Sequence, residues 1–405
     1  MHFELMHKNR PTASLELAAE NGKIYVEKLA SVYEREHMPV GTVHPDSPSY
    51  NRRKVEAWLN ERAIPKERSG LQRIIDSYGL PHPNLLLLDS LGISLSDQYW
   101  LKPADSNVTW GEVNFFENRF SEDLGEILLG NCGDIRDKVF RSPDATSSGN
   151  LPKKWQISNN RRILMKGGKR PYFQEPENET VASHVMEFIG VSHVEYDLTA
   201  VRGKTYSLCE TFVNRDTDFV SAHYVEDMSA DIPSDESKRL DFFLVWCEKR
   251  GITGVRPFLD RMITVDFMLC NTDRHLNNFG MLMDAETLEW IGPAPLFDTG
   301  NSLWNEIPTE HVRPGETGEC KPFRNDFHDQ LALVSDFSWL DPLKLKALPD
   351  EIAGLFRTHG ILDPGRIERI RDCLSWRVGF LEYAIADPAF LRRKPRHRRR
   401  PGSLP

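Results

Sequence analysis

The stretch that most constrains this chain is Cys270–Asp298, which reads CNTDRHLNNFGMLMDAETLEWIGPAPLFD. Before it, the apolar residues between positions 262 and 269 are spaced like the buried face of a helix, and they give way abruptly to a polar segment. Two short apolar runs follow, Phe279–Met283 and Leu288–Ile291, joined by four residues that include two acids. This pattern predicts a helix, a polar loop and then a β-hairpin.

The predicted hairpin is important because it returns the chain, so that Asp298 lies beside Asp273 and Asn278. Two carboxylates and a carboxamide suit phosphoryl transfer: one carboxylate orients the attacking hydroxyl, while the other and the carboxamide hold Mg²⁺ on the phosphates. Either piece alone is common in ordinary loops. Their order, together with the hairpin between them, favours phosphoryl transfer.

At these residues the chain resembles the HipA-like kinases, a bacterial family with a protein-kinase-like fold. The family's catalytic loop reads Asp-x-His-x-x-Asn, and its metal-binding aspartate follows a short hairpin; the matching residues are Asp273, His275, Asn278 and Asp298. The resemblance implies that Asp273 meets the acceptor hydroxyl and that Asn278 and Asp298 hold Mg²⁺. His275 is either a base or, as we expect, a support that bonds to the backbone near Asp298. The chain departs from eukaryotic kinases at Asp298–Thr299–Gly300, which stands where they have Asp-Phe-Gly.

A second group of candidate residues precedes the first. The small and polar residues of Ser142–Lys154 lead into Trp155–Ile157 and then Arg161–Lys166. A loop of this kind makes an anion nest, and a strand lysine after it, Lys166, would neutralise the α and β phosphates of a nucleotide. A plain surface turn and an exposed strand-end lysine are the alternative interpretations of the two features.

The family's phosphate loop reads Ser-x-Ser-Gly-x-x-x-Lys. The resemblance therefore implies five nucleotide-binding residues, which are Thr146, Ser148, Gly149, Asn150 and Lys153. In some members one hydroxyl of this loop is autophosphorylated, which ejects the loop and stops the enzyme. Thr146 and Ser148 stand at the hydroxyl positions here.

A helix is predicted over Glu175–Gly190, with Asn178 or Thr180 as its N-terminal cap. This helix is the natural place for a carboxylate that pairs with Lys166, and Glu179 matches the family's Asn–Glu pair. A solvated surface glutamate is the alternative.

A strand pair is predicted over Val194–Val201 and Lys204–Phe212. The second strand ends where a kinase-like fold has its hinge, and HipA-like enzymes carry Glu-x-Phe at this point. The resemblance implies that Glu210 and Phe212 lie at the adenine, the alternative being an ordinary strand end. Beyond it, the polar stretch Asp216–Glu236 is expected to be a surface excursion.

The predicted fold class is α+β: a two-lobed, protein-kinase-like (HipA-like) fold with a small N-terminal module and a mostly helical C-lobe. We expect the N-terminal module over residues 1–120, the N-lobe with phosphate loop and hinge over 121–215, the helical C-lobe with catalytic and metal loops over 216–390, and a basic disordered tail over 391–405. With 405 residues and 40% hydrophobic content, the chain can bury two such lobes.

Composition excludes several other classes. The six cysteines are far apart and form no CxxC, which argues against a zinc site or a disulfide framework and fits a reducing cytoplasm. No apolar run approaches the roughly 20 residues that span a bilayer, and Met1–Arg10 does not resemble a signal peptide, so we expect neither a membrane anchor nor export. The net charge of −9 disfavours indiscriminate nucleic-acid binding, except through the basic run Arg392–Arg400.

These patterns predict an ATP-dependent phosphotransferase that uses ATP and Mg²⁺. The resemblance implies a cytoplasmic serine/threonine-protein kinase with a protein substrate, the toxin of a toxin–antitoxin system whose antitoxin is a helix-turn-helix protein. Three alternatives stay open: a kinase of small molecules or lipid headgroups, a nucleotide-binding pseudokinase scaffold, and a DNA-associated partner that acts through the basic tail.

Overall fold

The computed structural model describes residues 1–20, 23–43, 50–68, 70–78, 84–131, 141–228, 232–233, 235–316, 318–387 and 390–391. The chain forms two compact units. Unit 1 comprises Met1–Gly167, Leu208–Ile232 and Gly280–Ala294, and unit 2 comprises Gly168–Ser207, Pro233–Phe279 and Pro295–Pro405. The predicted basic tail at Arg392–Arg400 lies outside the described residues, so its prediction is not tested.

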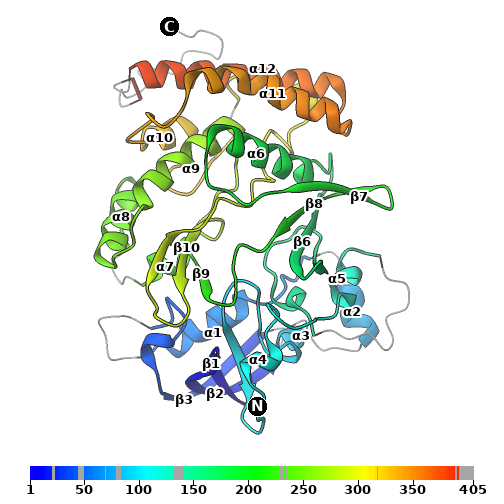
Figure 1. The fold of residues 1–405 in the computed structure, drawn as a ribbon, viewed down its shortest axis with the longest axis vertical. Helices are drawn as coiled ribbons and strands as arrows, with labels where there is room; N and C mark the ends of the chain where they lie inside the picture. The colour runs from blue at the N-terminus through cyan, green and yellow to red at the C-terminus, as the bar shows by residue number, and fades with distance from the viewer. Residues whose placement is uncertain are drawn as a thin grey trace. The chain divides into compact units, whose positions relative to one another are not determined.

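Unit 1 contains three groups of strands and several short helices (Figure 1). Its strands are β1 (His2–His7), β2 (Arg10–Glu20), β3 (Lys23–Val32), β4 (Tyr99–Pro103), β5 (Lys153–Ser158), β6 (Arg161–Gly167), β9 (Thr217–Ser221), β10 (Gly280–Asp284) and β11 (Trp290–Pro293). Its α-helices are α1 (Arg52–Glu61), α2 (Leu71–Tyr78), α3 (Asn84–Asp89), α4 (Trp110–Val113), α5 (Asp123–Leu128) and α7 (Ala222–Asp227), and 3-10 turns occur at Arg35–His37 and Pro143–Thr146.

The N-terminal sheet has the strand order β3-β2-β1-β4, and β1 pairs antiparallel with both β2 and β4. Alternate side chains of these strands point to one face, where α1 covers them with Val55, Trp58 and Leu59. A separate apolar cluster gathers Trp100, Trp110 and Phe115 and reaches the partly buried Trp155 of β5. The aromatic residues near position 110 therefore form a core that supports the strand following the predicted phosphate loop.

The predicted hairpin is confirmed, because β10 and β11 pair antiparallel, with Leu282 opposite Gly292. Its base is closed by a hydrogen bond of 2.9 Å from the Ala294 N–H to the Gly280 carbonyl. That closure brings the chain back next to the place where it left, as the sequence predicts. The hairpin belongs to unit 1, whereas the polar segments on both sides of it belong to unit 2.

The expectation of a surface excursion at Asp216–Glu236 is wrong for its first half. Thr217–Ser221 forms β9, which pairs antiparallel with β10, and α7 follows directly. Asp218 is buried in this strand because two donors compensate its charge: the Gln98 N–H at 2.8 Å, and the ring of His7 at 2.8 Å. The polar sequence of this stretch therefore includes a β-strand, because the buried partners of Asp218 allow its carboxylate to lie in the interior.

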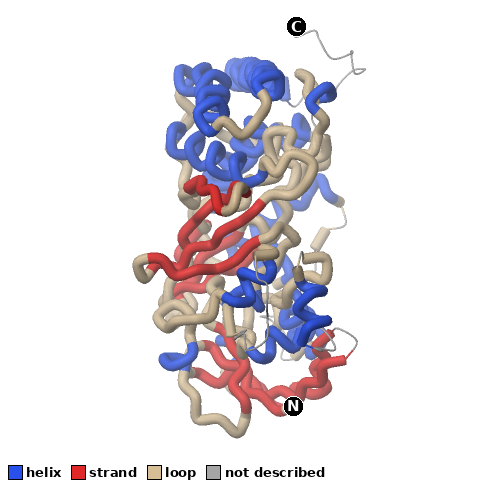
Figure 2. The backbone as a smooth tube through the Cα atoms, turned by 90° about the vertical axis from the view of Figure 1, so that its right-hand side faces the viewer, coloured by secondary structure: helices blue, strands red, loops and turns tan. Residues whose placement is uncertain are grey.

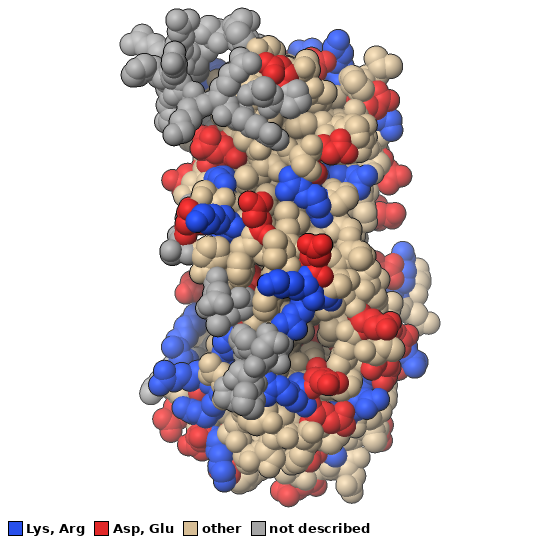
Figure 3. All heavy atoms as spheres, turned by 90° about the vertical axis from the view of Figure 1, so that its left-hand side faces the viewer, with Lys and Arg blue, Asp and Glu red and all other residues tan. Residues whose placement is uncertain are grey.

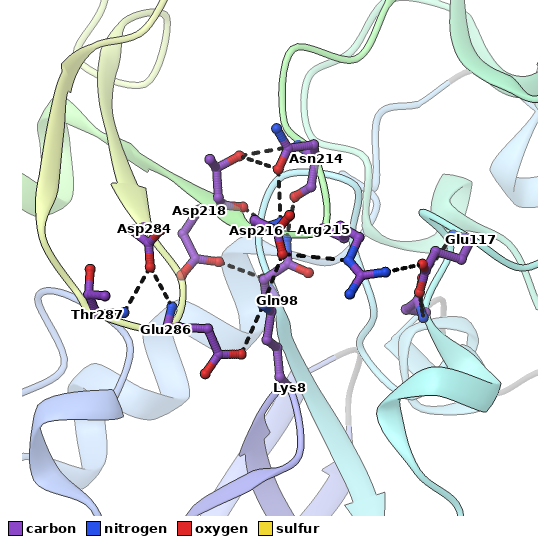
Figure 4. Close-up of polar contacts among 12 residues, drawn as sticks. Lys8, Gln98, Glu117, Asn214, Arg215, Asp216, Asp218, Asp284, Glu286 and Thr287 are labelled. Carbon is purple, nitrogen blue, oxygen red and sulfur yellow. Dashed lines mark hydrogen bonds and ion pairs between the residues drawn. The ribbon is translucent and has the colours of Figure 1, made fainter.

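Polar contacts tie the turn before β9 to its surroundings within unit 1 (Figure 4). The Gln98 side chain donates to the carbonyls of Asn214 and Thr217, both at 2.9 Å. Lys8 lies 3.0 Å from Glu286 in the β10–β11 turn, and Arg215 lies 2.6 Å from a Glu117 oxygen. Exposed ion pairs of this kind each contribute little to stability. The hydrogen bonds of the buried Gln98 side chain therefore contribute more to holding the turn before β9 in place.

Unit 2 is mostly helical. Its regular elements are α6 (Glu175–Ile189), β7 (Asp197–Val201), the start of β8 (Lys204–Glu210), α8 (Arg239–Lys249), α9 (Val255–Leu269), α10 (Phe327–Leu331), α11 (Pro342–His359) and α12 (Pro364–Ala386), with 3-10 turns at Glu236–Lys238 and Thr309–His311. Helices, blue in Figure 2, make up most of this unit; the long helices α11 and α12 lie side by side (Figure 1), and α11 also packs against α6. A buried face of apolar residues along α9, from Leu259 to Leu269, forms the support for the polar loop that follows it.

The remaining sheet has the strand order β5-β6-β8-β7, and the boundary between the units falls within β8, after Ser207.

On the face drawn in Figure 3, acidic and basic side chains lie interspersed. Among the described residues, no helix is both long enough and apolar enough to cross a membrane.

Candidate functional site

The polar loop begins where α9 ends. Cys270 adopts a left-handed backbone with φ 53°, which ends the helix, and the Asn271 N–H then bonds back to the Asp266 carbonyl at 2.9 Å. The Asn271 side chain donates to an Asp266 carboxylate oxygen at 2.8 Å and accepts the Asp273 N–H at 3.1 Å. Asp273 is therefore held at a fixed distance from the end of a buried helix.

Arg274 is the side chain that organises this loop. It is 0% exposed, and it donates to both carboxylate oxygens of Asp266, at 2.9 and 3.1 Å. Its Nη1 atom donates to the carbonyls of Asn278 and Phe297, both at 2.6 Å. Because Phe297 precedes Asp298, one guanidinium joins α9, the end of the loop and the predicted metal aspartate.

Sequence reasoning gave Arg274 no role. A signal for it was present in Asp266, the one acid inside the largely apolar 262–269 segment, because a buried carboxylate requires a cationic or hydrogen-bonding partner. The partner lies eight positions further along the chain, beyond the end of the helix, and helical spacing alone does not reveal it.

Each carboxylate oxygen of Asp273 accepts one hydrogen bond. Lys321 Nζ lies 2.9 Å from Oδ1, and Asn301 Nδ2 lies 3.1 Å from Oδ2. Asn301 is itself fixed, because its amide oxygen accepts a bond of 3.1 Å from Asn305. The Asp273 side chain remains 35% exposed, so it is oriented and still open to a reactant.

Asn278 and Asp298 offer the oxygens that a hard cation prefers. Asn278 Nδ2 donates to the Asp273 carbonyl at 2.8 Å, which leaves Oδ1 as the atom of this amide that can coordinate a metal. Asp298 has a left-handed φ of 58°, and its N–H is 3.3 Å from the Tyr196 hydroxyl. Among the described residues, no three His, Cys, Asp or Glu side chains gather as a self-sufficient metal site. A carboxylate and a carboxamide fit Mg²⁺ that also binds phosphate oxygens.

His275 makes a different contact from the one that we expected. Its Nδ1 atom accepts the Asn277 N–H at 3.2 Å, and Arg274 makes the bond to the backbone before Asp298. Burial lowers the pKa of His275, and the nearby carboxylates of Asp273 and Asp298 partly oppose this change. The imidazole is therefore neutral at pH 7.

The segment after Asp298 is fastened to α6. Asn178 is fully buried and donates to the carbonyls of Gly300 and Ser302, at 2.9 and 2.7 Å. The prediction that Asn178 or Thr180 caps the helix is wrong, since α6 begins at Glu175 with Gln174 as its N-cap. Asn178 instead holds the segment beyond Asp298.

Close packing explains the glycine of the Asp-Thr-Gly segment. A Cβ on Gly300 would lie 3.2 Å from Glu175 Cβ and 3.5 Å from Glu179 Cγ. Glu179 itself is buried and accepts a hydrogen bond from the Ser207 hydroxyl. The predicted partner of Lys166 is thus an interior carboxylate, not a solvated surface residue.

Unit 1 contains the predicted phosphate loop. Thr146 is buried, and its hydroxyl donates to the Ile93 carbonyl at 2.7 Å. Ser148, Gly149 and Asn150 are exposed, and Lys153 Nζ donates to the Ser148 carbonyl at 2.6 Å. Thr146 therefore belongs to the base of the loop, and the next residues form its open tip.

Asp144 fastens the start of this loop to β5. One of its carboxylate oxygens accepts the Trp155 N–H at 2.8 Å, and the other accepts the Ser142 hydroxyl at 2.9 Å. The carboxylate is fully buried, and burial raises its pKa to about 7, while these two bonds act in the opposite direction.

Lys166 lies directly beside the end of the loop. In the β5–β6 register it is opposite Lys153, and the Gly167 N–H donates to the Pro152 carbonyl at 2.7 Å. Its side chain is buried, which differs from the exposed strand-end lysine that was the alternative.

The two predicted adenine residues flank Thr211 at the end of β8. The Thr211 N–H bonds to the Arg162 carbonyl of β6 at 3.0 Å. Glu210 is exposed and lies 3.5 Å from Arg161, and the Phe212 ring packs edge-on against Phe219 with centroids 5.4 Å apart. The backbone at this point is thus held by the sheet.

Comparisons with known proteins address the fold. No family model matches the chain, and no curated protein matches it. Among solved structures, it is similar to the Shewanella oneidensis MR-1 toxin–antitoxin complex of HipA, HipB and operator DNA, at 14% identity and a TM-score of 0.60, over 95% of this chain and 99% of that chain. It is also similar to the Helicobacter pylori proinflammatory kinase CtkA, at 16% identity and a TM-score of 0.49, over 61% of this chain and 94% of that one.

The near-complete coverage of the Shewanella structure identifies the class of fold, a two-lobed, kinase-like α+β arrangement. More specifically, the chain has the HipA-like fold that the sequence predicts, with an N-terminal module and a mostly helical C-terminal part. That prediction is confirmed. At 14% identity this likeness concerns the fold alone.

Removing the Arg274 guanidinium should destabilise unit 2 strongly. We expect Arg274→Met to lower the free energy of unfolding by about 3–5 kcal/mol, because Asp266 is then a buried charge without its cation. Urea denaturation measures the loss. The double variant Asp266→Asn with Arg274→Met should lose less than the single variant, and an Arg274→Met protein as stable as wild type would contradict the assignment.

Protonation of Asp144 should make stability depend on pH. Since the pKa is about 7 in the folded protein and near 3.8 ordinarily, the folded protein holds a proton that the unfolded chain has lost between those values. The free energy of unfolding of wild type, relative to Asp144→Asn, should therefore fall as pH rises from 5 to 7.5 and then level off.

The control for that experiment is Asp284→Asn. Backbone N–H groups of Thr287 and Glu286 lower the pKa of Asp284 below its ordinary value of 3.8, so its contribution to stability is lost only in acid and should not change between pH 5 and 7.5. Parallel pH profiles for wild type and Asp144→Asn, in denaturant titrations, would show that Asp144 does not take up the proton.

Proposed function

We propose that this protein is an ATP-dependent phosphotransferase, and that its substrate is the serine or threonine hydroxyl of a protein. The observation that carries the proposal is the pair of hydrogen bonds that Arg274 donates to the Asn278 and Phe297 carbonyls. The buried Arg274, which directly follows Asp273, thereby fixes the backbone of Asn278 and of the residue before Asp298, and these three residues supply the groups that phosphoryl transfer requires. The HipA-like fold is consistent with this chemistry.

Phosphate binding is assigned to unit 1. The backbone N–H groups at the exposed tip of the loop would donate hydrogen bonds to phosphate oxygens, and Lys166 would neutralise the α and β phosphates. We assign Lys153 and Thr146 to the support of the loop, because Lys153 donates to the Ser148 carbonyl and Thr146 to that of Ile93. Glu179 would pair with Lys166, and Glu210 and Phe212 would lie at the adenine.

Mg²⁺ would be held by Asn278 Oδ1 and the Asp298 carboxylate. When bound, the ion neutralises charge on the phosphate oxygens. Arg274 and Asn178 are responsible for the preorganisation, since they hold the backbone on both sides of Asp298. The lowered pKa of His275 favours its neutral form, so this side chain would add no positive charge beside Asp273 and Asp298.

Asp273 would orient the acceptor hydroxyl for in-line attack. The hydroxyl oxygen forms a bond to the γ phosphorus as the bond from that phosphorus to the ADP oxygen breaks, and the hydroxyl proton passes to the Asp273 carboxylate. Asn301 holds one carboxylate oxygen, and the partly exposed Lys321 is the donor that can move away from the other. Positioning and charge neutralisation supply most of the rate.

The biological setting belongs to the same proposal. The Shewanella structure contains HipA together with HipB and operator DNA. We propose by analogy that this chain is the kinase toxin of a cytoplasmic toxin–antitoxin pair, whose helix-turn-helix partner contacts the DNA. A small-molecule kinase shares the same loop chemistry, and labelling a lysate with radioactive ATP separates the two, because labelled protein bands require a protein substrate.

Two aspartate substitutions test the roles. Asp273→Asn should lower kcat for phosphoryl transfer by about 10²-fold or more and leave ATP affinity within about threefold, because it orients only the acceptor. Asp298→Asn should instead abolish the dependence of ATP affinity on Mg²⁺. Transfer of radiolabelled phosphate and calorimetric titration with ATP measure the two effects.

Asp241→Asn, on the exposed face of α8, is the matched control and should behave as wild type. Undiminished transfer by Asp273→Asn would exclude the assigned role. A wild-type protein that binds neither ATP nor GTP in the presence of Mg²⁺ would exclude the function itself.

Autophosphorylation of the loop, if the protein performs it, should select Ser148. Ser148 is exposed, whereas Thr146 is buried and its hydroxyl is already bonded to main-chain carbonyls. Phosphopeptide mapping after incubation with ATP and Mg²⁺ should place the label on Ser148 and lose it in Ser148→Ala. Label on Thr146 in the wild-type protein would contradict this expectation.

A further inference from the structure

Arg68 makes an unusual set of contacts with the phosphate loop. It lies in the turn before α2, is only 2% exposed, and donates to three successive carbonyls: Ser147 at 2.6 Å, Ser148 at 2.8 Å and Gly149 at 2.7 Å. A fourth donor reaches the Ser147 hydroxyl at 3.3 Å. Neither the sequence pattern nor the resemblance pointed to this residue.

The direction of these carbonyls fixes the direction of the N–H groups. In a planar trans peptide, the carbonyl and the following N–H point to opposite sides. The N–H groups of Ser148, Gly149 and Asn150 must therefore point away from Arg68, and Gly149 permits the turn with a φ of +81°. Within the described part of the chain, none of these three N–H groups has a hydrogen-bond acceptor.

Three successive N–H groups on one exposed side form an anion nest. The guanidinium also strengthens them as donors, because a cation bonded to a carbonyl polarises the peptide whose N–H lies on the other side. Burial lowers the pKa of Arg68 to about 10, so the side chain still carries its charge at neutral pH.

The turn that carries Arg68 is itself fixed. The Arg68 N–H bonds to the Pro65 carbonyl at 3.0 Å, and a Cβ on Gly70 would lie 2.7 Å from the Ile127 carbonyl of α5. Leu71, just beyond the turn, shares an apolar cluster with Ala145, which precedes the loop. The segments that carry Arg68 and the phosphate loop therefore pack on the same apolar cluster, which fixes their positions relative to each other.

We propose that Arg68 is a positioning residue that holds the 147–149 carbonyls inward, so that the Ser148, Gly149 and Asn150 N–H groups form a binding site for the β and γ phosphates of a nucleoside triphosphate. The identity of that ligand rests on the proposed function, whereas the nest itself rests on the contacts above. A residue from the N-terminal part of the chain thus fixes the backbone of the phosphate loop on the side opposite to the N–H groups.

The test compares Arg68→Gln with Arg62→Gln. Arg62 is the matched control, because it is buried in the same region and pairs with Asp97 at 2.6 Å, and its guanidinium donates to Asp97 and to the Gly92 carbonyl instead of the phosphate loop. Calorimetric titrations with MgATP, adenosine and inorganic tripolyphosphate separate phosphate binding from base binding. We expect Arg68→Gln to weaken MgATP and tripolyphosphate by about 10- to 100-fold and adenosine by less than twofold.

Arg62→Gln should leave all three affinities within twofold, although both variants lose stability, which separates positioning from general destabilisation. Arg68→Lys keeps the charge with fewer donors and should give an intermediate loss. If Arg68→Gln does not fold, Arg68→Lys and Gly149→Ala, which disturbs the +81° backbone, take its place and should both weaken tripolyphosphate.

The outcomes distinguish the two proposals. Unchanged affinities for MgATP and tripolyphosphate in the Arg68 variants would overturn the positioning role. Equal losses for adenosine and for tripolyphosphate would also overturn it, because they indicate a general structural effect. If the wild-type protein binds tripolyphosphate through Arg68 but binds no nucleotide, the nest stands and the proposed function fails.

Discussion

The buried bond between the Arg274 guanidinium and the Asp266 carboxylate is the contact on which the catalytic part of this protein depends. A buried ion pair at 2.9 Å is costly to form, and it is stable only because the remaining guanidinium donors also find acceptors. Those acceptors are carbonyls of two segments separated by the hairpin. The hydrogen bonds of this one arginine thus fix both the 271–278 loop and the backbone that leads into Asp298.

The same device recurs along the chain. Arg366 is buried and donates to the carbonyls of Trp304 and Ile307, and Arg377 donates to the Phe267 carbonyl next to the end of α9. Arg68 does so for the phosphate loop. Irregular segments have carbonyls that no helix or sheet satisfies, and a planar guanidinium with five donors can satisfy several at once. Rigid loops can in this way hold reactive groups without regular structure.

The sequence predicted the hairpin, α6 and the β5–β6 pair, because each has strong local periodicity and its own turn or helix signals. It failed at β9, where Asp218 interrupts the apolar pattern and is compensated by His7, more than two hundred residues earlier. It also mistook Asn178 for a cap, although that side chain serves carbonyls beyond Asp298. Each failure concerns a buried polar residue whose partner is distant in the chain.

Sequence alone determined the kinds of chemical group available and their order: an aspartate, an asparagine and a second aspartate around a hairpin, with a glycine-containing loop and a lysine before them. These follow from local rules of periodicity and turn formation. Only the tertiary structure decided which donors meet which acceptors, namely Arg274 with Phe297 and Arg68 with the 147–149 carbonyls. The reason is physical, since a buried hydrogen bond depends on where two distant segments pack, and no local pattern encodes that.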